Sequence, residues 1–534
     1  MTTKPERFIA DSRRPYTGAE YLKSLVDERE VFIDGQRIAD VTSHPALRNS
    51  ARSLARLYDA LHDPVKHPGI TCETDTGSGG YTHNFFRIQR SRKDLVAAQH
   101  AITQWSRLSY GWMGRAPDYK ASFTNTLGAN PEFYGPYAAN ARRWYKLAQE
   151  TLPFMNHSIV NPPIDRHKPV SEVKDVYISV QKETDAGIIV SGAKVVATSS
   201  ALAHYNFVGQ TGKTATDDPD MSLAFMLPIN APGVKLICRA SYEHAAQRGG
   251  TPFDYPLSSR FDENDAILIL DKVLIPWEDV LIYRDPHRIK NFFLGSGFFS
   301  GFLFHGCTRL AVKLDFLTGL LAKALHTTGG DALRGNLALL GEVVAWRHMF
   351  WSFSNAMAHN PDPWIGDAVL PERQAAMSYN VFAPECYRRV GEIIRRTVAS
   401  GLIYLPSSVK DLQSPETAGY LKQYVRGSHD IGHVERIKTM KLLWDAVGTE
   451  FGGRHELYEM NYAGGWEDIR VSVAAEAEKF GRMTAMKSLV EQCMADYDQN
   501  GWTGDTWINP QDHAAPLAAT DPKTAPLPPV PVAA

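Results

Sequence analysis

Apolar residues recur at helical spacing through the first 150 residues. Between residues 45 and 62 the apolar positions are Leu47, Ala51, Leu54, Tyr58 and Leu61, and residues 91–110 repeat the pattern. Thr17 and Glu20 have the spacing of a capping box that opens a short helix. Asp34-Gly35 in VFIDGQRI, residues 31–38, is typical of a hairpin turn. The pattern predicts a mainly helical domain over residues 1–150.

The period changes to that of strands over residues 151–285. The short apolar runs are DVYISV (175–180), GIIVSG (187–192), SLAFML (222–227), GVKLIC (233–238) and AILIL (266–270). Because Gly, Pro, Asn and Asp separate these runs, they predict a compact antiparallel β-domain.

Helical spacing returns over residues 286–510 and predicts a helical bundle. The long amphipathic segments are 310–325, 337–357, 375–400 and 433–449. The Pro- and Ala-rich tail, residues 511–534, is expected to be disordered or to form a surface arm. Helices, then a β-domain, then a bundle predict an α+β fold, in the order found in acyl-CoA dehydrogenases, where a flavin lies between the last two.

Composition narrows the class of protein. The 534 residues are 44% hydrophobic and carry a net charge of −2, which supports neither nucleic-acid nor anionic-membrane binding. The five cysteines form no C-x-x-C pair, so we expect no disulfide framework and no metal site. The N-terminus lacks an apolar signal core, and no run approaches the roughly 18 apolar residues of a membrane span. A cytoplasmic protein is expected.

Three familiar motifs are incomplete. Gly209 to Thr214 partly matches a phosphate loop, but Phe207 stands where the first glycine is required. The RHELYE segment, residues 454–459, lacks the second histidine of a zinc-protease helix. His429 and His433 are spaced as ligands but have no third ligand nearby in the sequence, so we interpret them as exposed or capping residues. No G-x-G-x-x-G follows a strand, so a Rossmann nicotinamide site is not expected.

Four segments have two interpretations each. The first is GWMGRAPDYK, residues 111–120. Either Arg115 caps the preceding helix and Tyr119 packs in the core, or both residues direct hydrogen-bond donors at one small polar ligand. His157 precedes the rigid Pro162-Pro163 pair and either serves a site or bonds a backbone carbonyl. Thr198 to Ser200 end a strand, either as a plain turn or as ligand contacts. Gly448, Gly452 and Gly453 form either a helix corner or a cofactor turn.

A fifth segment, YPLSSRFDENDAIL (255–268), is dense in polar groups before a strand. We interpret it as a salt-bridged structural loop.

Together the segments resemble one family. The motifs are GAEYLKSL, TDTGSGGYTH, LSYGWMGRAPDYK, NHSIVNPPIDR, GIIVSGAKVVATSSA, DYPLSSRFDENDAI, VLIPWEDVLIY, SGLIYLPSS, WDAVGTEFGGRHELYE and DYDQNGW. They resemble, from about Pro15 to Trp502, the oxygenase component of the two-component 4-hydroxyphenylacetate 3-hydroxylases. The resemblance implies that a separate NAD(P)H:flavin reductase supplies reduced FAD by diffusion. A flavin C4a-hydroperoxide formed with O2 then hydroxylates a phenol at the ortho position to give a catechol.

The resemblance also implies the site residues. Arg115, Tyr119 and His157 are expected around the phenol oxygen, where a cation and two hydrogen-bonding groups favour phenolate and fix the ring. Which of the three takes the phenol proton stays open. The expected flavin contacts are His157, Pro163, Asp165, Arg166, Thr198, Thr449, Glu450, Phe451 and Gly452, with Thr198 near flavin N5.

The substrate and the assembly stay open at this point. Phenol, a 4-alkylphenol, 4-hydroxyphenylacetate and 4-coumarate are all candidates, and only Lys213 or Arg248 is at hand to hold a carboxylate. An acyl-CoA dehydrogenase-like flavoenzyme is the alternative function. A homodimer or homotetramer is expected, because the helical bundle offers more apolar surface than one β-domain can cover.

Overall fold

The computed structural model describes residues 12–165, 167–210 and 216–503. The described chain forms two units, which divide after Ala463. The predicted tail, residues 511–534, lies outside the described residues. No helix in the described part is both long and apolar enough to cross a membrane.

The N-terminal segment is mainly helical, as its periodicity predicts. Its helices are α1 (Gly18–Ser24), α2 (Arg48–Ala60), α3 (Arg92–Leu108), α4 (Ala121–Ala129) and α5 (Ala138–Glu150). The capping box at Thr17 and Glu20 is formed. A small hairpin joins β3 (Thr71–Glu73) and β4 (Tyr81–His83). The predicted hairpin is also present, as β1 (Glu30–Ile33) and β2 (Gln36–Ile38), with Asp34 and Gly35 at φ of 52° and 74°.

Two sheets occupy the middle of the chain. The strands are β5 (Met155–Ser158), β6 (Ser179–Thr184), β7 (Gly187–Lys194), β8 (Tyr205–Val208), β9 (Ala224–Pro228), β10 (Val234–Cys238), β11 (Ala266–Pro276) and β12 (Val280–Ile282), with α6 (Tyr242–Gly249) between β10 and β11. The sheet orders are β2-β1-β10-β11-β7-β6 and β12-β9-β8-β5.

The sheets are mixed rather than wholly antiparallel. The pairs β1–β10 and β5–β8 are parallel. Both join strands that no hairpin connects, and the N-terminal hairpin extends the middle sheet at its edge. Strand periodicity identifies such strands but carries no information on pairing direction.

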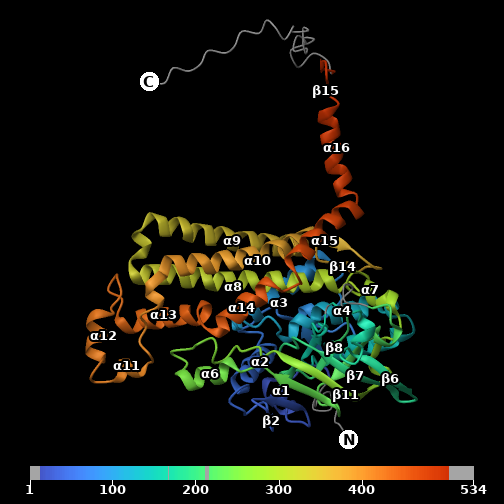
Figure 1. Cartoon of the computed structure of the whole chain (residues 1–534), viewed down its shortest axis with the longest axis horizontal. Coiled ribbons are helices and arrows are strands. Elements are labelled where there is room, and N and C mark those ends of the chain that lie inside the picture. Colours follow the sequence, from blue (N-terminus) through green and yellow to red (C-terminus); the bar gives the residue numbers. More distant parts are fainter. Residues whose placement is uncertain (1–11, 166, 211–215, 504–534) are drawn as a thin grey trace. The chain divides into compact units, whose positions relative to one another are not determined.

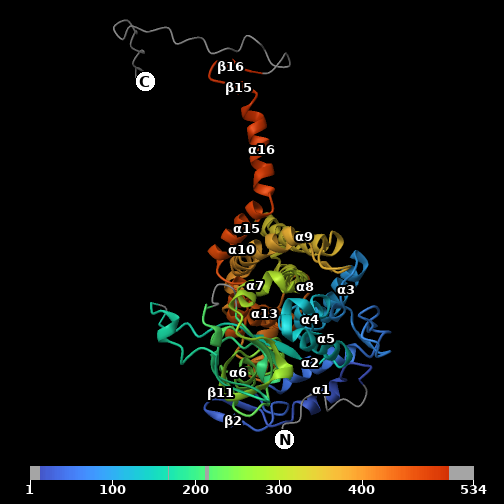
Figure 2. The ribbon, with the colours of Figure 1, turned by 90° about the vertical axis from the view of Figure 1, so that its right-hand side faces the viewer.

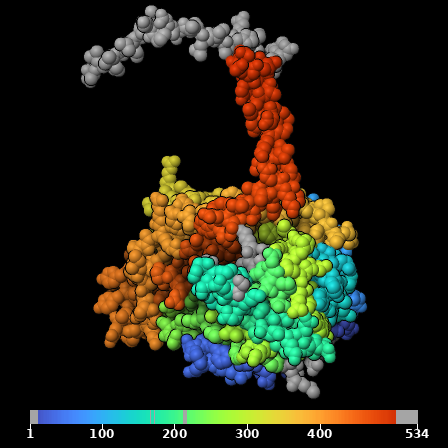
Figure 3. Space-filling model, turned by 45° about the vertical axis from the view of Figure 1, so that its right-hand side comes forward, coloured from blue at the N-terminus to red at the C-terminus, as the bar shows by residue number. Residues whose placement is uncertain are grey.

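Long helices return after the sheets. They are α7 (Pro286–Gly295), α8 (Phe298–Thr328), α9 (Arg334–His359), α10 (Arg373–Val398), α11 (Lys410–Gln413), α12 (Ala418–Tyr424), α13 (His433–Val447) and α14 (Glu450–Met460), with a short β13–β14 hairpin (Asp362–Pro363 and Val369–Leu370). Helices α8, α9 and α10 pack side by side on one side of the sheets (Figures 1 and 2). On the face shown in Figure 3, the blue N-terminal residues lie below the teal and green residues of the middle segment.

One buried hydrophobic cluster joins the N-terminal helices, both sheets and the bundle, from Tyr16 to Phe451. The chain therefore has the predicted α+β architecture of the acyl-CoA dehydrogenase type, while the domain limits at 150 and 285 stay a prediction. The second unit contains α15 (Trp466–Lys479), α16 (Arg482–Met494) and the hairpin of β15 (Tyr497–Asp498) and β16 (Gly501–Trp502).

Candidate active site

The GWMGRAPDYK segment leaves helix α3 and enters a short 3-10 helix, Pro117–Lys120. Gly111 makes the exit with φ of 77°, and a Cβ there would lie 2.7 Å from the backbone nitrogen of Lys313. Pro117 begins the 3-10 turn, where its fixed φ suits a helix start. The segment thus places Arg115 just before the turn and Tyr119 within it, both buried.

The Arg115 side chain is held by tyrosines rather than by a carboxylate. Its guanidinium carbon lies 4.1 Å from the ring centroid of Tyr119 and 5.0 Å from those of Tyr458 and Tyr462. Its Nη1 donates a hydrogen bond to the hydroxyl of Tyr458 at 2.6 Å. The Arg115 backbone N–H donates to Glu263. The side-chain charge therefore stays available to an anionic ligand.

His157 lies on β5 against the same tyrosine. Its ring centroid is 5.4 Å from that of Tyr119, in an edge-to-face arrangement. Burial, followed by the charges of Lys120 and Arg115, holds the pKa of His157 well below its usual range. The imidazole is therefore neutral near pH 7, and only one of its two nitrogens carries a proton. The structure thus brings the three predicted phenol-site residues together.

Lys120 is a member of this group that sequence reasoning missed. Its side chain is fully buried, and its Nζ lies 2.8 Å from Nδ1 of His157. It has no carboxylate partner in the described part of the chain. The signal in the sequence was its place directly after Tyr119, at the end of the quoted motif.

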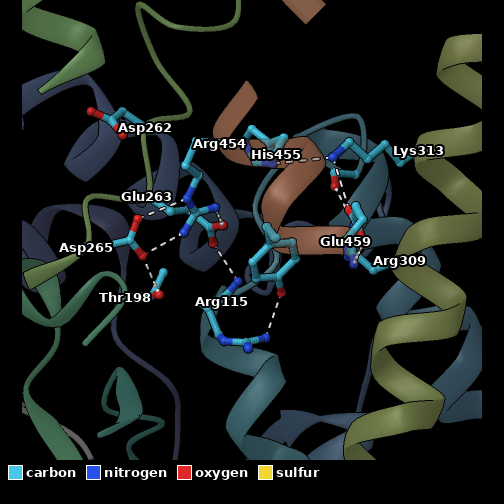
Figure 4. Close-up of polar contacts among 12 residues, drawn as sticks. Arg115, Thr198, Asp262, Glu263, Asp265, Arg309, Lys313, Arg454, His455 and Glu459 are labelled. Atoms are coloured by element: carbon cyan, nitrogen blue, oxygen red, sulfur yellow. Dashed lines mark hydrogen bonds and ion pairs between the residues drawn. The ribbon is translucent and has the colours of Figure 1, made fainter. Parts of the chain in front are cut away.

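Thr198 is joined to Arg115 through a buried polar network (Figure 4). The Thr198 hydroxyl donates to Asp265 at 2.6 Å, and Arg454 holds the same carboxylate at 2.8 and 3.0 Å. Arg454 also reaches Glu263 at 3.5 Å, and Glu263 accepts the backbone N–H of Arg115. The predicted flavin contact and the predicted phenol site are therefore neighbours.

Asp265 is the ionised centre of that network. Burial raises its pKa, but Arg454, Arg239 and the Thr198 hydroxyl outweigh burial and hold the pKa of Asp265 well below its usual range. Arg239 also pairs with Asp262 at 2.7 Å. The prediction that residues 255–268 form a salt-bridged loop is therefore confirmed.

Asn156 connects the backbones of the two predicted regions. Its side-chain amide donates to the carbonyl of Thr198 at 2.7 Å and reaches the carbonyl of Arg115 at 3.5 Å. Its Oδ1 accepts the backbone N–H of His157 at 3.0 Å. The residue before His157 therefore fixes the position of the β5 end relative to the trio. The residues themselves left two interpretations of this segment open, and only the resemblance favoured a site.

The loop after β5 carries the next predicted flavin contacts. Pro163 and Asp165 are exposed, and Asp165 adopts φ of 42° while pairing with Lys168 at 3.3 Å. Arg166 lies outside the described residues. The flavin role of Pro163, Asp165 and Arg166 stays a prediction.

The turn before α14 forms a tight helix corner. Thr449 caps α14 by accepting the N–H of Gly452 at 3.3 Å, and Glu450 begins the helix. Phe451 is buried against the ring of Trp112 at 5.4 Å. A Cβ on Gly452 would lie 2.8 Å from the carbonyl of Ala446, so this glycine is required for packing. A flavin role of this turn stays a prediction beside its structural one.

Two rejected motifs have structural explanations. Glu459, which replaces the second histidine of a zinc-protease helix, forms buried ion pairs with Arg309 and Lys313 (Figure 4). His429 does not pair with His433: it stacks on His326 at 4.2 Å, beside Asp331. A third potential ligand therefore is nearby in space, although none stands nearby in sequence. Within the described residues this is the one such trio found.

The hydrogen-bond acceptors near Thr198 fit a flavin. Because the Thr198 hydroxyl gives its proton to Asp265, its lone pairs remain available to an N–H. On β8, Asn206 donates to Ser158 and Ser200, while its buried Oδ1 has no hydrogen-bond partner in the described chain. The polar edge of reduced flavin carries N–H donors that match such acceptors.

Comparisons with known proteins show which family the chain resembles. Family models described as 4-hydroxyphenylacetate 3-hydroxylase N terminal and C terminal match residues 17–282 and 289–491. The 4-hydroxyphenylacetate 3-monooxygenase oxygenase component of Pseudomonas aeruginosa is 59% identical over 510 residues, covering 95% of this chain and 98% of that protein. The 4-nitrophenol 2-monooxygenase oxygenase component of a Rhodococcus species is 53% identical over 504 residues, covering 94% and 96%.

A solved structure is also similar. It is an oxygenase component of 4-hydroxyphenylacetate 3-monooxygenase complexed with FAD and 4-hydroxyphenylacetate, with a TM-score of 0.84 and 28% identity. The match covers 90% of this chain and 99% of that one.

Proposed function

Because the chain belongs to the 4-hydroxyphenylacetate 3-hydroxylase family, we propose that it is the oxygenase component of a two-component aromatic hydroxylase that converts a phenol to a catechol. FAD is the cofactor, and a separate reductase provides it in reduced form. The observation that carries the proposal is the trio of buried Arg115, buried Tyr119 and partly buried His157, which offers one cation and two hydrogen-bonding groups to a phenol oxygen.

The trio suits hydroxylation because the attacked ring must be electron-rich. Arg115, with no carboxylate at its guanidinium, stabilises the phenolate form of the substrate. Neutral His157 accepts a proton at the nitrogen that Lys120 does not contact. Tyr119 lies between them and orients the phenol oxygen, so that only the ortho carbon is presented for reaction.

Bound reduced FAD would supply the activated oxygen for this reaction. Thr198, Pro163, Asp165, Arg166 and the turn Thr449–Gly452 are the residues we propose to hold it. Thr198 would accept an N–H of the flavin, because its own hydroxyl proton is donated to Asp265. The buried surroundings of Arg115 exclude water, which strengthens the interaction between its charge and the phenolate.

The substrate is proposed to be a phenol with or without a para substituent: phenol, a 4-alkylphenol or 4-hydroxyphenylacetate. Two relatives are named for 4-hydroxyphenylacetate and 4-nitrophenol, which share only the para-substituted phenol. Of the two sequence candidates for a carboxylate contact, Arg248 is exposed on α6, and Lys213 lies outside the described residues.

The test supplies chemically reduced FAD and air to the purified protein and offers phenol, 4-ethylphenol, 4-hydroxyphenylacetate and 4-coumarate separately. We expect a catechol from at least one of them, and the order of rates gives the substrate class. Arg115→Ala should abolish catechol formation, whereas Arg56→Ala, at an exposed position on α2, should leave it unchanged. Oxidation of reduced FAD to hydrogen peroxide alone, with every phenol, would contradict the proposal.

We also propose that the protein is a homodimer or homotetramer. Large apolar side chains are exposed on the helices after α10: Tyr420 is 67% exposed, Tyr424 72% and Leu457 63%. Exposed large apolar side chains are typical of a surface that another copy covers. Light scattering coupled to size-exclusion chromatography checks this, and a monomeric mass at micromolar concentration would contradict it.

A further inference from the structure

The bond between Lys120 and His157 raises the question of where the phenol proton goes. Nζ of Lys120 and Nδ1 of His157 lie 2.8 Å apart, so one proton lies between them. If Lys120 is an ammonium, it donates to Nδ1, and Nε2 carries the imidazole proton. If Lys120 is a neutral amine, Nδ1–H donates to it, and Nε2 is left as a proton acceptor.

The surroundings of Lys120 favour the neutral amine before substrate binds. The side chain is fully buried and has no carboxylate partner in the described chain, and the positive charge of Arg115 acts on it. Burial, followed by Arg115, holds the pKa of Lys120 well below its usual range. His157 then presents Nε2 as an acceptor, and this nitrogen makes no hydrogen bond to any described residue.

The same surroundings can hold the ammonium once an anion is close. Nζ lies 4.4 Å from the ring centroid of Phe298, and the rings of Tyr119, Phe123 and Phe207 lie at 5.1, 5.5 and 5.7 Å. Aromatic faces attract a cation, each by about 0.5–2 kcal/mol. These four aromatic rings provide no counterion for the ammonium, and a phenolate held at Arg115 and His157 would provide one.

We propose that Lys120 is the final acceptor of the phenol proton, through a relay over His157. The O–H bond of the phenol breaks as its proton moves to Nε2 of His157. The Nδ1–H bond of His157 breaks as that proton moves to the amine of Lys120, which becomes an ammonium. The imidazole ends neutral, with Nε2–H donating to the phenolate oxygen.

The relay has one measurable consequence: the proton stays inside the protein. Phenolate forms on binding without proton release to the buffer, because the amine of Lys120 takes the proton. If Lys120 were already an ammonium, forming phenolate would release about one proton per site. Proton counting therefore distinguishes the two states of the lysine.

The experiment uses the full chain with oxidised FAD, which cannot start turnover, and 4-nitrophenol, whose phenolate is yellow. The pH is set well below the pKa of free 4-nitrophenol. Difference absorbance measures bound phenolate, and calorimetry in two buffers of different ionisation enthalpy counts protons. Bound phenolate with no proton released supports the relay; bound phenolate with about one proton released, or no bound phenolate, overturns it.

Two variants complete the test. Lys120→Met cannot take a proton, so the pKa of bound 4-nitrophenol should rise by at least about one unit, a tenfold loss of phenolate at fixed pH. Lys194→Met is the matched control, since Lys194 is also buried and hydrogen-bonded to a neutral group, Asn161, at 2.6 Å. An unchanged pKa of the bound phenol in Lys120→Met would overturn the relay.

The relay rests on the proposed hydroxylase function, but different experimental results would contradict the relay and the function. If catechol forms normally while binding releases a proton, the relay is wrong and the function stands. If phenolate binds without proton release and no phenol gives a catechol, the function is wrong and the proton path stands.

Discussion

Removing the hydroxyl of Tyr458 should weaken the reaction without disturbing the fold. In Tyr458→Phe the ring stays beneath the guanidinium of Arg115, so the 5.0 Å cation–π contact is kept. What is lost is the 2.6 Å hydrogen bond from Arg115 Nη1, the one side-chain hydrogen bond that Arg115 makes within the described residues. The variant therefore keeps the charge of Arg115 in place and removes only the hydrogen bond that orients it.

The magnitude follows from the charge on the donor. A hydrogen bond to a charged group contributes about 1.5–3 kcal/mol, and each 1.4 kcal/mol is about tenfold in rate. If the bond directs Arg115 at the phenolate, kcat/KM for the phenol should fall by about 10- to 100-fold. Because the cation–π contacts of Arg115 remain, some activity should remain as well.

The assay measures catechol formation with chemically reduced FAD over a range of phenol concentrations, together with the thermal midpoint of unfolding. Tyr379→Phe is the matched control, since its hydroxyl is also buried but has no hydrogen-bond partner in the described chain. The control should keep wild-type activity. If Tyr458→Phe also stays within about threefold of wild type, the hydrogen bond does not direct Arg115, and the reasoning is refuted.

Four further predictions test the surroundings of the site. Gly114→Ala should lower kcat/KM at least as much as Tyr458→Phe, because the new Cβ would lie 2.2 Å from the Tyr458 hydroxyl and displace it; wild-type kinetics would contradict this. Asp265→Asn should cost about 1.5–3 kcal/mol near pH 7 by removing the carboxylate that Arg454 and Arg239 share, which leaves Glu263 and Asp262 as their remaining partners. Because the folded pKa of Asp265 is lowered, its contribution is present above about pH 4 and is lost as the pH falls further; urea unfolding of wild type, but not of the variant, should show this loss. Glu243→Ala should cost about 1–3 kcal/mol in urea unfolding, since Glu243 accepts the backbone N–H groups of Asn49 and Ser50 at the start of α2; no change would show that water replaces it. Gly453→Ala should raise stability by about 0.5–1 kcal/mol, because nothing lies within 4 Å of the new Cβ in α14; a loss of FAD affinity measured by fluorescence titration would instead show that the flavin approaches this backbone.

Local features of the sequence determined the elements themselves. Thr17 and Glu20 form their capping box because both partners lie within one turn, and Asp34-Gly35 forms its hairpin because both residues tolerate positive φ. The helical period of residues 310–325, 337–357 and 375–400 became α8, α9 and α10. Each of these features depends on residues a few positions apart, so the sequence alone is enough to predict it.

The trio of the candidate site was predicted only because whole motifs resemble a family. No spacing rule joins Arg115 to His157, which meet through the ring of Tyr119. Tyr458, which accepts a hydrogen bond from Arg115, lies on α14, far along the chain. The sequence placed it in an incomplete zinc motif and in one of the family motifs, neither of which assigns it a role beside Arg115. Such partners come together when α14 packs against the segment after α3.

Tertiary structure alone decided which groups are charged and which helix ends are satisfied. Leu47 at the start of α2 offers no capping side chain, and Glu243, 194 residues from Asn49, supplies the missing acceptor. Lysine side chains are mostly exposed, but the fold buries Lys120 beside His157, and this burial holds the pKa of Lys120 well below its usual range. Side-chain periodicity and caps act over one or two turns, whereas desolvation and long-range hydrogen bonds exist only after distant segments have packed together.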